Sequence, residues 1–85
     1  EGEGNMFRVL LKTDVLTIGE RAFPVRYFEL RTHRGTRRYS ADILIGPGDH
    51  IILDDDSISN LETRAPNVVP ATIDSRALAA RRTAA

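Results

Sequence analysis

Three consecutive aspartates end a short apolar segment and are the side chains here that most resemble a metal site. Alternate residues of a strand point to the same side, so Asp54 and Asp56 would converge while Asp55 points away. With the hydroxyl of Ser57 or the amide of Asn60, they would form a weak site for a hard cation. The pattern fails as an EF-hand loop, because serine stands where glycine is needed and alanine where a bidentate glutamate is needed. We therefore expect strand-ending residues, with Asp56 or Ser57 capping a helical turn, and neither a metal nor a cofactor.

An arginine-rich segment, LRTHRGTRRY (residues 30–39), offers the second kind of chemistry. Closing a hairpin on Arg34 and Gly35 places Arg31 opposite Arg38, with His33 further along the same face. Like charges directly opposite one another destabilise a sheet, and an anion between two guanidinium groups would relieve the repulsion. The predicted binding residues are Arg31, His33, Arg34, Arg37 and Arg38.

Two other interpretations of this segment remain open. An exposed hairpin tip can carry charge simply to stay in solution and to protect a sheet edge from aggregation, with Glu29 beside Arg31 on the same face. The tip can also contact a protein partner. The segment alone does not separate these interpretations from phosphate binding.

Catalysis has little support in the sequence. General acid–base chemistry requires a titratable group in a pocket close to a second functional group. His33 lies in the basic tip and His50 follows a glycine turn, so both are expected to be surface or turn residues. Neither a nucleophile elbow nor a phosphate-binding glycine loop is present in the sequence, and we expect a protein that is not an enzyme.

The elements that would position these residues are mainly strands. In residues 25–45 the apolar pattern and the glycine agree on a hairpin that sets Leu30 opposite Tyr39, Phe28 opposite Ala41 and Arg26 opposite Ile43. Further strands are expected at residues 6–11, 15–18 and 50–53. They are separated by a bend at residues 12–14, a tight turn at Gly19-Glu20 that opposes Leu16 to Phe23, and a turn at residues 45–49.

These strands predict a mainly β fold, a five- to six-stranded antiparallel meander or a small SH3-like or OB-like barrel. An open sheet covered by a helix is the alternative. A helical turn is expected near residues 57–64, with Ser59 and Glu62 at capping-box spacing and Pro66 ending the turn. Residues 67–73 could add an edge strand. Asp74 or Ser75 could cap a weak C-terminal helix.

Composition indicates one small domain. Residues 6–73 are expected to form it, residues 74–85 a short helix or flexible tail, and residues 1–5 (EGEGN) an appended remnant. Removing Glu1 and Glu3 from the 12 acids leaves 10 against 12 lysines and arginines, a net charge near +2. The absence of cysteine fits a reducing compartment, and the absence of a long apolar run or signal segment indicates a cytoplasmic protein with no membrane contact.

Charge is arranged in two blocks. Residues 21–38 contain six arginines and one acid, whereas residues 42–62 contain six acids and neither lysine nor arginine. The blocks can neutralise each other within the fold, or they can form opposite faces that orient a partner.

From these features the sequence predicts a non-catalytic adaptor or accessory module. It would bind a protein partner, or itself, through the charged hairpin or a sheet edge. Nucleic-acid binding through residues 31–38 is the alternative. That class usually combines a strong positive charge with solvent-facing aromatic residues, and the sequence offers neither.

Overall fold

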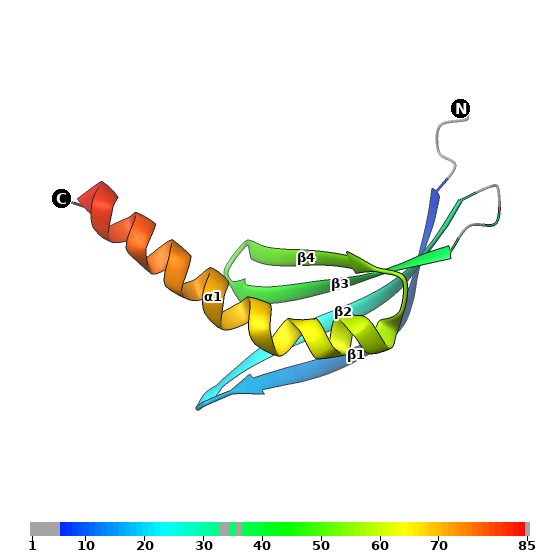
Figure 1. Cartoon of the computed structure of the whole chain (residues 1–85), viewed down its shortest axis with the longest axis horizontal. Coiled ribbons are helices and arrows are strands. Elements are labelled where there is room, and N and C mark those ends of the chain that lie inside the picture. The colour runs from blue at the N-terminus through cyan, green and yellow to red at the C-terminus, as the bar shows by residue number, and fades with distance from the viewer. Residues whose placement is uncertain (1–5, 33–34, 36, 85) are drawn as a thin grey trace.

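The computed structural model describes residues 6–32, 35 and 37–84, which form one open antiparallel sheet and a long helix on one of its faces (Figure 1). The fold is mainly β. The sheet order follows the chain, so β1 and β4 are its edge strands. The elements in chain order are β1 (Met6–Ile18), β2 (Arg21–Thr32), β3 (Arg37–Gly46), β4 (Asp49–Asp55) and α1 (Ile58–Ala84).

Glycine allows the chain to reverse between these strands. Gly19, Gly35 and Gly48 have φ angles of 62°, 86° and 68°, a region that side chains with a Cβ rarely enter. The predicted turns at Gly19-Glu20 and at residues 45–49 are confirmed, and Leu16 lies opposite Phe23 as expected.

The predicted strand count and closed barrel are not what the structure shows. The described residues contain four strands, and the sheet stays open because α1 covers its apolar face. The expected bend at residues 12–14 is wrong. β1 continues through it, with a β-bulge between Leu10 and Lys12 that adds Leu11 to the strand.

The predicted register of the second hairpin is also wrong. Leu30 lies opposite Arg38, Phe28 opposite Ser40, and Tyr27 opposite Ala41, a slip of one residue from the expected pairs. Apolar residues occupy both faces of β2, so alternation alone does not select one register. The observed one places Tyr27 and Ala41 together beneath the helix, where both are buried.

The hydrophobic core lies between α1 and one face of the sheet. Leu61, Ala65 and Val69 recur at four-residue spacing along the helix and are at most 1% exposed. They meet the buried side chains that β2, β3 and β4 direct to that face: Phe23, Val25, Tyr27, Ala41, Ile43, Ile51 and Leu53.

The helix begins where expected and ends much later. The Ser57 hydroxyl accepts a hydrogen bond from the Asn60 backbone N–H at 3.1 Å, which confirms the predicted cap, whereas Ser59 lies inside the first turn. Pro66 does not end the helix, and residues 67–73 are helical rather than a strand, so Asp74 and Ser75 are interior positions. Burial of the apolar stripe offsets the hydrogen bonds that Pro66 and Pro70 remove.

The two prolines inside α1 coincide with a bend in the helix. Figure 1 shows the axis of α1 changing direction between its yellow first half and its orange and red second half, as expected from Pro66 and Pro70. The second half then extends past the sheet, linked back to it by an ion pair between Arg76 and Asp49. No helix in the described part of the chain is long and apolar enough to cross a membrane.

Candidate functional site

The arginines of the predicted anion site have partners within the chain. The like-charge pair is Arg31 opposite Arg37, rather than Arg38. Buried Glu29 lies beside both, 2.9 Å from the Arg31 guanidinium and 3.5 Å from that of Arg37. Arg38 pairs instead with Asp56 at 2.5 Å. A carboxylate therefore already fills the role proposed for an external anion at the described arginines, whereas His33 and Arg34 lie outside the described residues.

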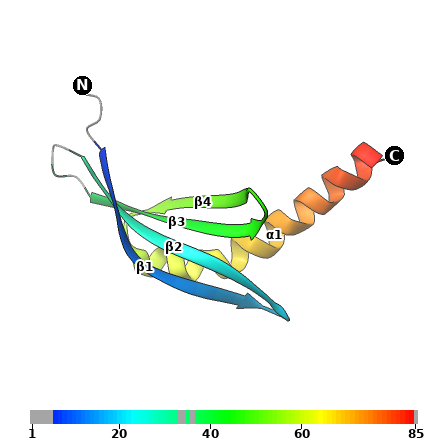
Figure 2. The same cartoon turned by 180° about the vertical axis from the view of Figure 1, so that it is seen from behind.

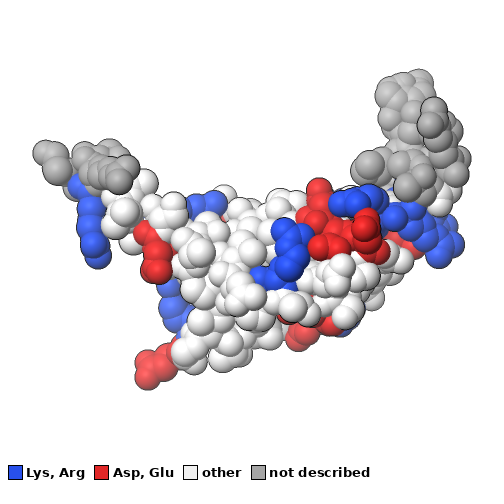
Figure 3. Space-filling model, in the orientation of Figure 1, with Lys and Arg blue, Asp and Glu red and all other residues white. Residues whose placement is uncertain are grey.

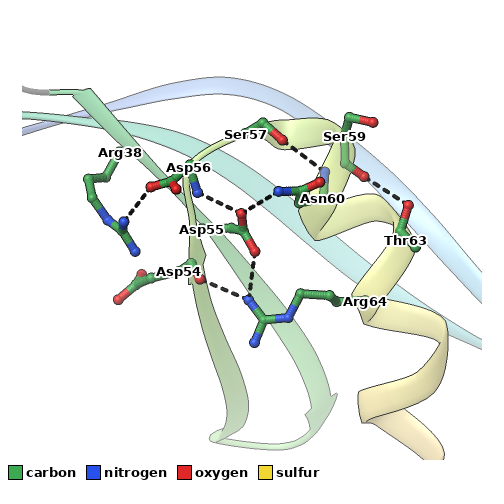
Figure 4. A network of polar contacts seen from close by, with 9 residues as sticks. All are labelled: Arg38, Asp54, Asp55, Asp56, Ser57, Ser59, Asn60, Thr63 and Arg64. Atoms are coloured by element: carbon green, nitrogen blue, oxygen red, sulfur yellow. Dashed lines mark hydrogen bonds and ion pairs between the residues drawn. The ribbon is translucent and has the colours of Figure 1, made fainter.

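The three aspartates bind side chains of the helix and of β3. Figure 4 shows Asp55 pointing toward α1, where its carboxylate accepts hydrogen bonds from the Asn60 amide at 2.7 Å and from Arg64 at 3.1 Å. Arg64 also donates to the backbone carbonyl of Asp54 at 2.9 Å. Asp54 and Asp56 were expected to converge, with Asp55 pointing away from them. In the structure it is Asp55 whose side chain connects the end of β4 to the first turns of the helix.

This network makes stability depend on pH. The hydrogen bond from Asn60, with those from the Asp56 N–H and Arg64, lowers the pKa of Asp55 from its ordinary 3.8, although desolvation opposes them. The ionised form is thus favoured in the fold. Its contribution is present above the ordinary pKa and is lost as the pH falls through the lowered one.

We therefore expect the Tm of the wild-type chain to fall more steeply below about pH 4 than that of Asp55→Asn. Thermal melts across an acid pH series measure this. Asn60→Ala keeps the carboxylate but removes its main donor, so its acid loss should be smaller than that of the wild type and complete at a higher pH. Identical acid profiles for the three chains would contradict the role of Asp55.

A charged cluster that was not predicted from the sequence lies on the uncovered face of the sheet. Asp42, 7% exposed, lies 3.1 Å from Arg26, 3.8 Å from Arg8 and 2.7 Å from His50 Nδ1. The Arg8 guanidinium also stacks over the Phe28 ring, 3.8 Å from its centroid. In the observed register of β2 and β3, Arg26 lies opposite Asp42. The predicted hairpin set Arg26 opposite Ile43 instead, and the cluster could not be found from it.

These pairs decide how the two charge blocks are arranged. Arg26 and Asp42, and Arg38 and Asp56, each join one residue of the basic block to one of the acidic block. Figure 3 shows the same mixing, with basic side chains lying directly against the main acidic cluster. The blocks neutralise each other within the fold, as one of the two interpretations expected.

Exposed apolar side chains gather instead on the edge strand β1. Among the described residues, seven large hydrophobic side chains are exposed, and five of them belong to this strand: Phe7, Val9, Leu10, Leu11 and Val15. Their exposed fractions run from 46% to 60%. Figure 2 shows β1 along the margin of the sheet, on the side away from β4. A long apolar edge strand with one side unpaired is a template for a further strand.

The opposite edge is protected. β4 is 7 residues long and carries Asp49, Asp54 and Asp55, and charge on an edge discourages pairing with other chains. Arg64 occupies the Asp54 carbonyl at its end. β1 is 13 residues long and has three charged side chains, Arg8, Lys12 and Asp14, among its apolar ones. The two edges of this sheet therefore differ in how readily they accept a partner.

No protein-family model, curated protein or solved structure matches this chain.

Proposed function

We propose that this chain is a non-catalytic interaction module, an adaptor or accessory domain, that binds a protein partner or a second copy of itself by adding a strand at β1. The observation that carries the proposal is the concentration of exposed apolar side chains on one edge strand. Strand addition draws affinity from backbone hydrogen bonds and specificity from alternate side chains, and β1 offers both.

The internal ion pairs support this choice over the charged hairpin. Arg31, Arg37 and Arg38 each have a carboxylate partner within 3.5 Å, so a phosphate would have to displace an acid that is already in place. The unpaired backbone of an edge strand, in contrast, gains hydrogen bonds without displacing a protein group.

A nitrogen–proton NMR titration tests the proposal. The probe is an extended peptide in which valine and threonine alternate between terminal lysines, and its control carries a central proline that cannot donate a ladder hydrogen bond. We expect chemical-shift changes along β1 with the first peptide and none with the second. Changes confined to β4, or absent with both peptides when the chain is monomeric, would reject strand addition at β1.

A short mixed oligonucleotide, added at about 50 mM and at about 200 mM salt, tests the nucleic-acid alternative. Shifts confined to residues 31–38 that disappear at the higher salt would favour it. An unchanged spectrum at both salt concentrations would reject it.

A further inference from the structure

We propose that the partner of β1 is β1 of a second copy of this chain, paired antiparallel about a two-fold axis through Thr13. This inference rests on the proposed function and specifies its partner and register. It follows from the bulge at Leu11, from the placement of charge and from the exposed apolar residues of the strand.

The bulge reverses which residues of β1 face the helix. Before it, Val9 lies opposite Glu29 of β2, on the helix side of the sheet. After it, Lys12 lies opposite Tyr27, and its ammonium group reaches Glu62 of α1 at 2.5 Å. Odd-numbered residues therefore face the helix before the bulge and even-numbered residues face it afterwards.

When β1 pairs with itself, each residue must lie opposite a residue of the second copy that faces the same side of the sheet. The change of face at the bulge therefore limits the possible registers. With the axis at Thr13, residues 12–14 pair with residues 14–12 of the second copy. Leu10 and Leu11 together then oppose Val15 of the second copy, as expected for a bulge that sets two residues against one. Beyond the bulge the pairs again share a face, so both copies keep their own bulge without conflict.

In this register the apolar residues meet one another. On the helix side Val9 pairs with Leu16 of the second copy and Phe7 with Ile18. On the uncovered face Val15, 59% exposed in the single chain, covers the bulge. By symmetry each contact forms twice, so all five of the exposed apolar residues of β1 gain an apolar neighbour.

The charges meet in the same register. Lys12 lies opposite Asp14 of the second copy, and the symmetry repeats this pair on the other side of the axis. A groove lined in part by Asp14, Leu16 and Glu62 borders β1 here and would receive the Lys12 and Val9 side chains of the second copy. An axis at Val15 also matches faces, but it sets Lys12 against Ile18 and Asp14 against Leu16, so neither charge meets an opposite charge of the second copy.

Pairing β1 with β1 also closes the assembly. Adding β1 of one copy to β4 of the next is a head-to-tail contact that leaves new edges and continues into a filament. The two-fold contact uses each β1 once and leaves only the charged β4 edges at the ends of an eight-stranded sheet (twice the 4 strands of one chain).

Cysteine cross-linking tests the register, because the chain contains no cysteine of its own. Thr13→Cys places two thiols directly opposite each other at the axis. Thr17→Cys, on the same strand and face, faces Arg8 of the second copy and is the matched control. With a short bis-maleimide we expect Thr13→Cys to form covalent dimers at least about tenfold faster, since paired thiols meet at a high effective concentration.

Sedimentation velocity on the wild-type chain completes the test. A dimer that Val15→Lys converts to monomer supports the proposal. A monomeric wild type, or equal cross-linking of the two cysteine variants, overturns it. In that case the peptide titration still decides the proposed function. Peptide binding at β1 would mean that β1 accepts a strand from a different protein. No binding would reject both strand addition at β1 and self-pairing through it.

Discussion

Replacing Leu61 with alanine is expected to lower the free energy of unfolding by about 3 kcal/mol. Leu61 is fully buried, at the centre of the contact between α1 and the sheet. The substitution removes its apolar contacts and leaves a cavity that the rigid sheet cannot fill by collapsing. Urea denaturation measures the loss, which should appear as a lower midpoint with an unchanged slope.

The matched control is Leu78→Ala, the same substitution in the second half of the same helix. Leu78 is 50% exposed and lies where α1 has left the sheet, so its loss should stay within about 0.5 kcal/mol. Equal losses for the two variants would contradict the packing of the first half of α1 on the sheet.

Reversing the charge of Asp14 is expected to weaken self-association by about 2 kcal/mol, or roughly thirtyfold in Kd. In the proposed dimer, Asp14→Lys replaces two attractive pairs with Lys12 of the other copy by two repulsive ones. Asp14 is exposed in the single chain, so we expect the fold itself to persist. Sedimentation equilibrium measures the dissociation constant.

Glu20→Lys is the control for this prediction. It makes the same change in net charge at the β1–β2 turn, beyond the paired residues, and is exposed as Asp14 is. We expect its dissociation constant to match that of the wild type at moderate salt. If the two variants weaken association equally, only net charge is involved, and the register at Thr13 is wrong.

Local signals in the sequence were sufficient for the turns and for the overall class of fold. The tight turn predicted at Gly19 is present, and Leu16 lies opposite Phe23 as expected. The register of the second hairpin could not be predicted from the local apolar pattern alone. Its tip is polar on both sides, so only tertiary contacts, the helix above Tyr27 and Ala41 and the acid at Glu29, select the observed pairing.

The continuation of the helix beyond Pro66 was missed because proline received too much weight. Pro66 predicted a stop, yet Leu61, Ala65 and Val69 continue a helical stripe across it, and their burial exceeds the local cost of the proline. The sequence also contained a pattern that indicates the bulge at Leu11. Apolar residues at Phe7 and Val9 and again at Leu16 and Ile18 change from odd to even positions, which indicates an inserted residue rather than a turn.

A sheet edge was among the predicted contact sites, but the sequence could not say which edge. That choice depends on strand order and on which neighbours neutralise the arginines, both of which are properties of the folded chain. Spacing along the strand placed Glu29 beside Arg31, as the structure has it. The pairing of Arg38 with Asp56, which lies in a distant part of the sequence, could not be derived from spacing.

Amide hydrogen exchange at a low and a high protein concentration tests whether the chain pairs through β1. We expect the protection of residues 6–18 to rise with concentration, while the amides of β4 exchange equally at both. Protection that rises at β4 or at residues 31–38 instead, or a β1 strand whose exchange is the same at both concentrations, would contradict it.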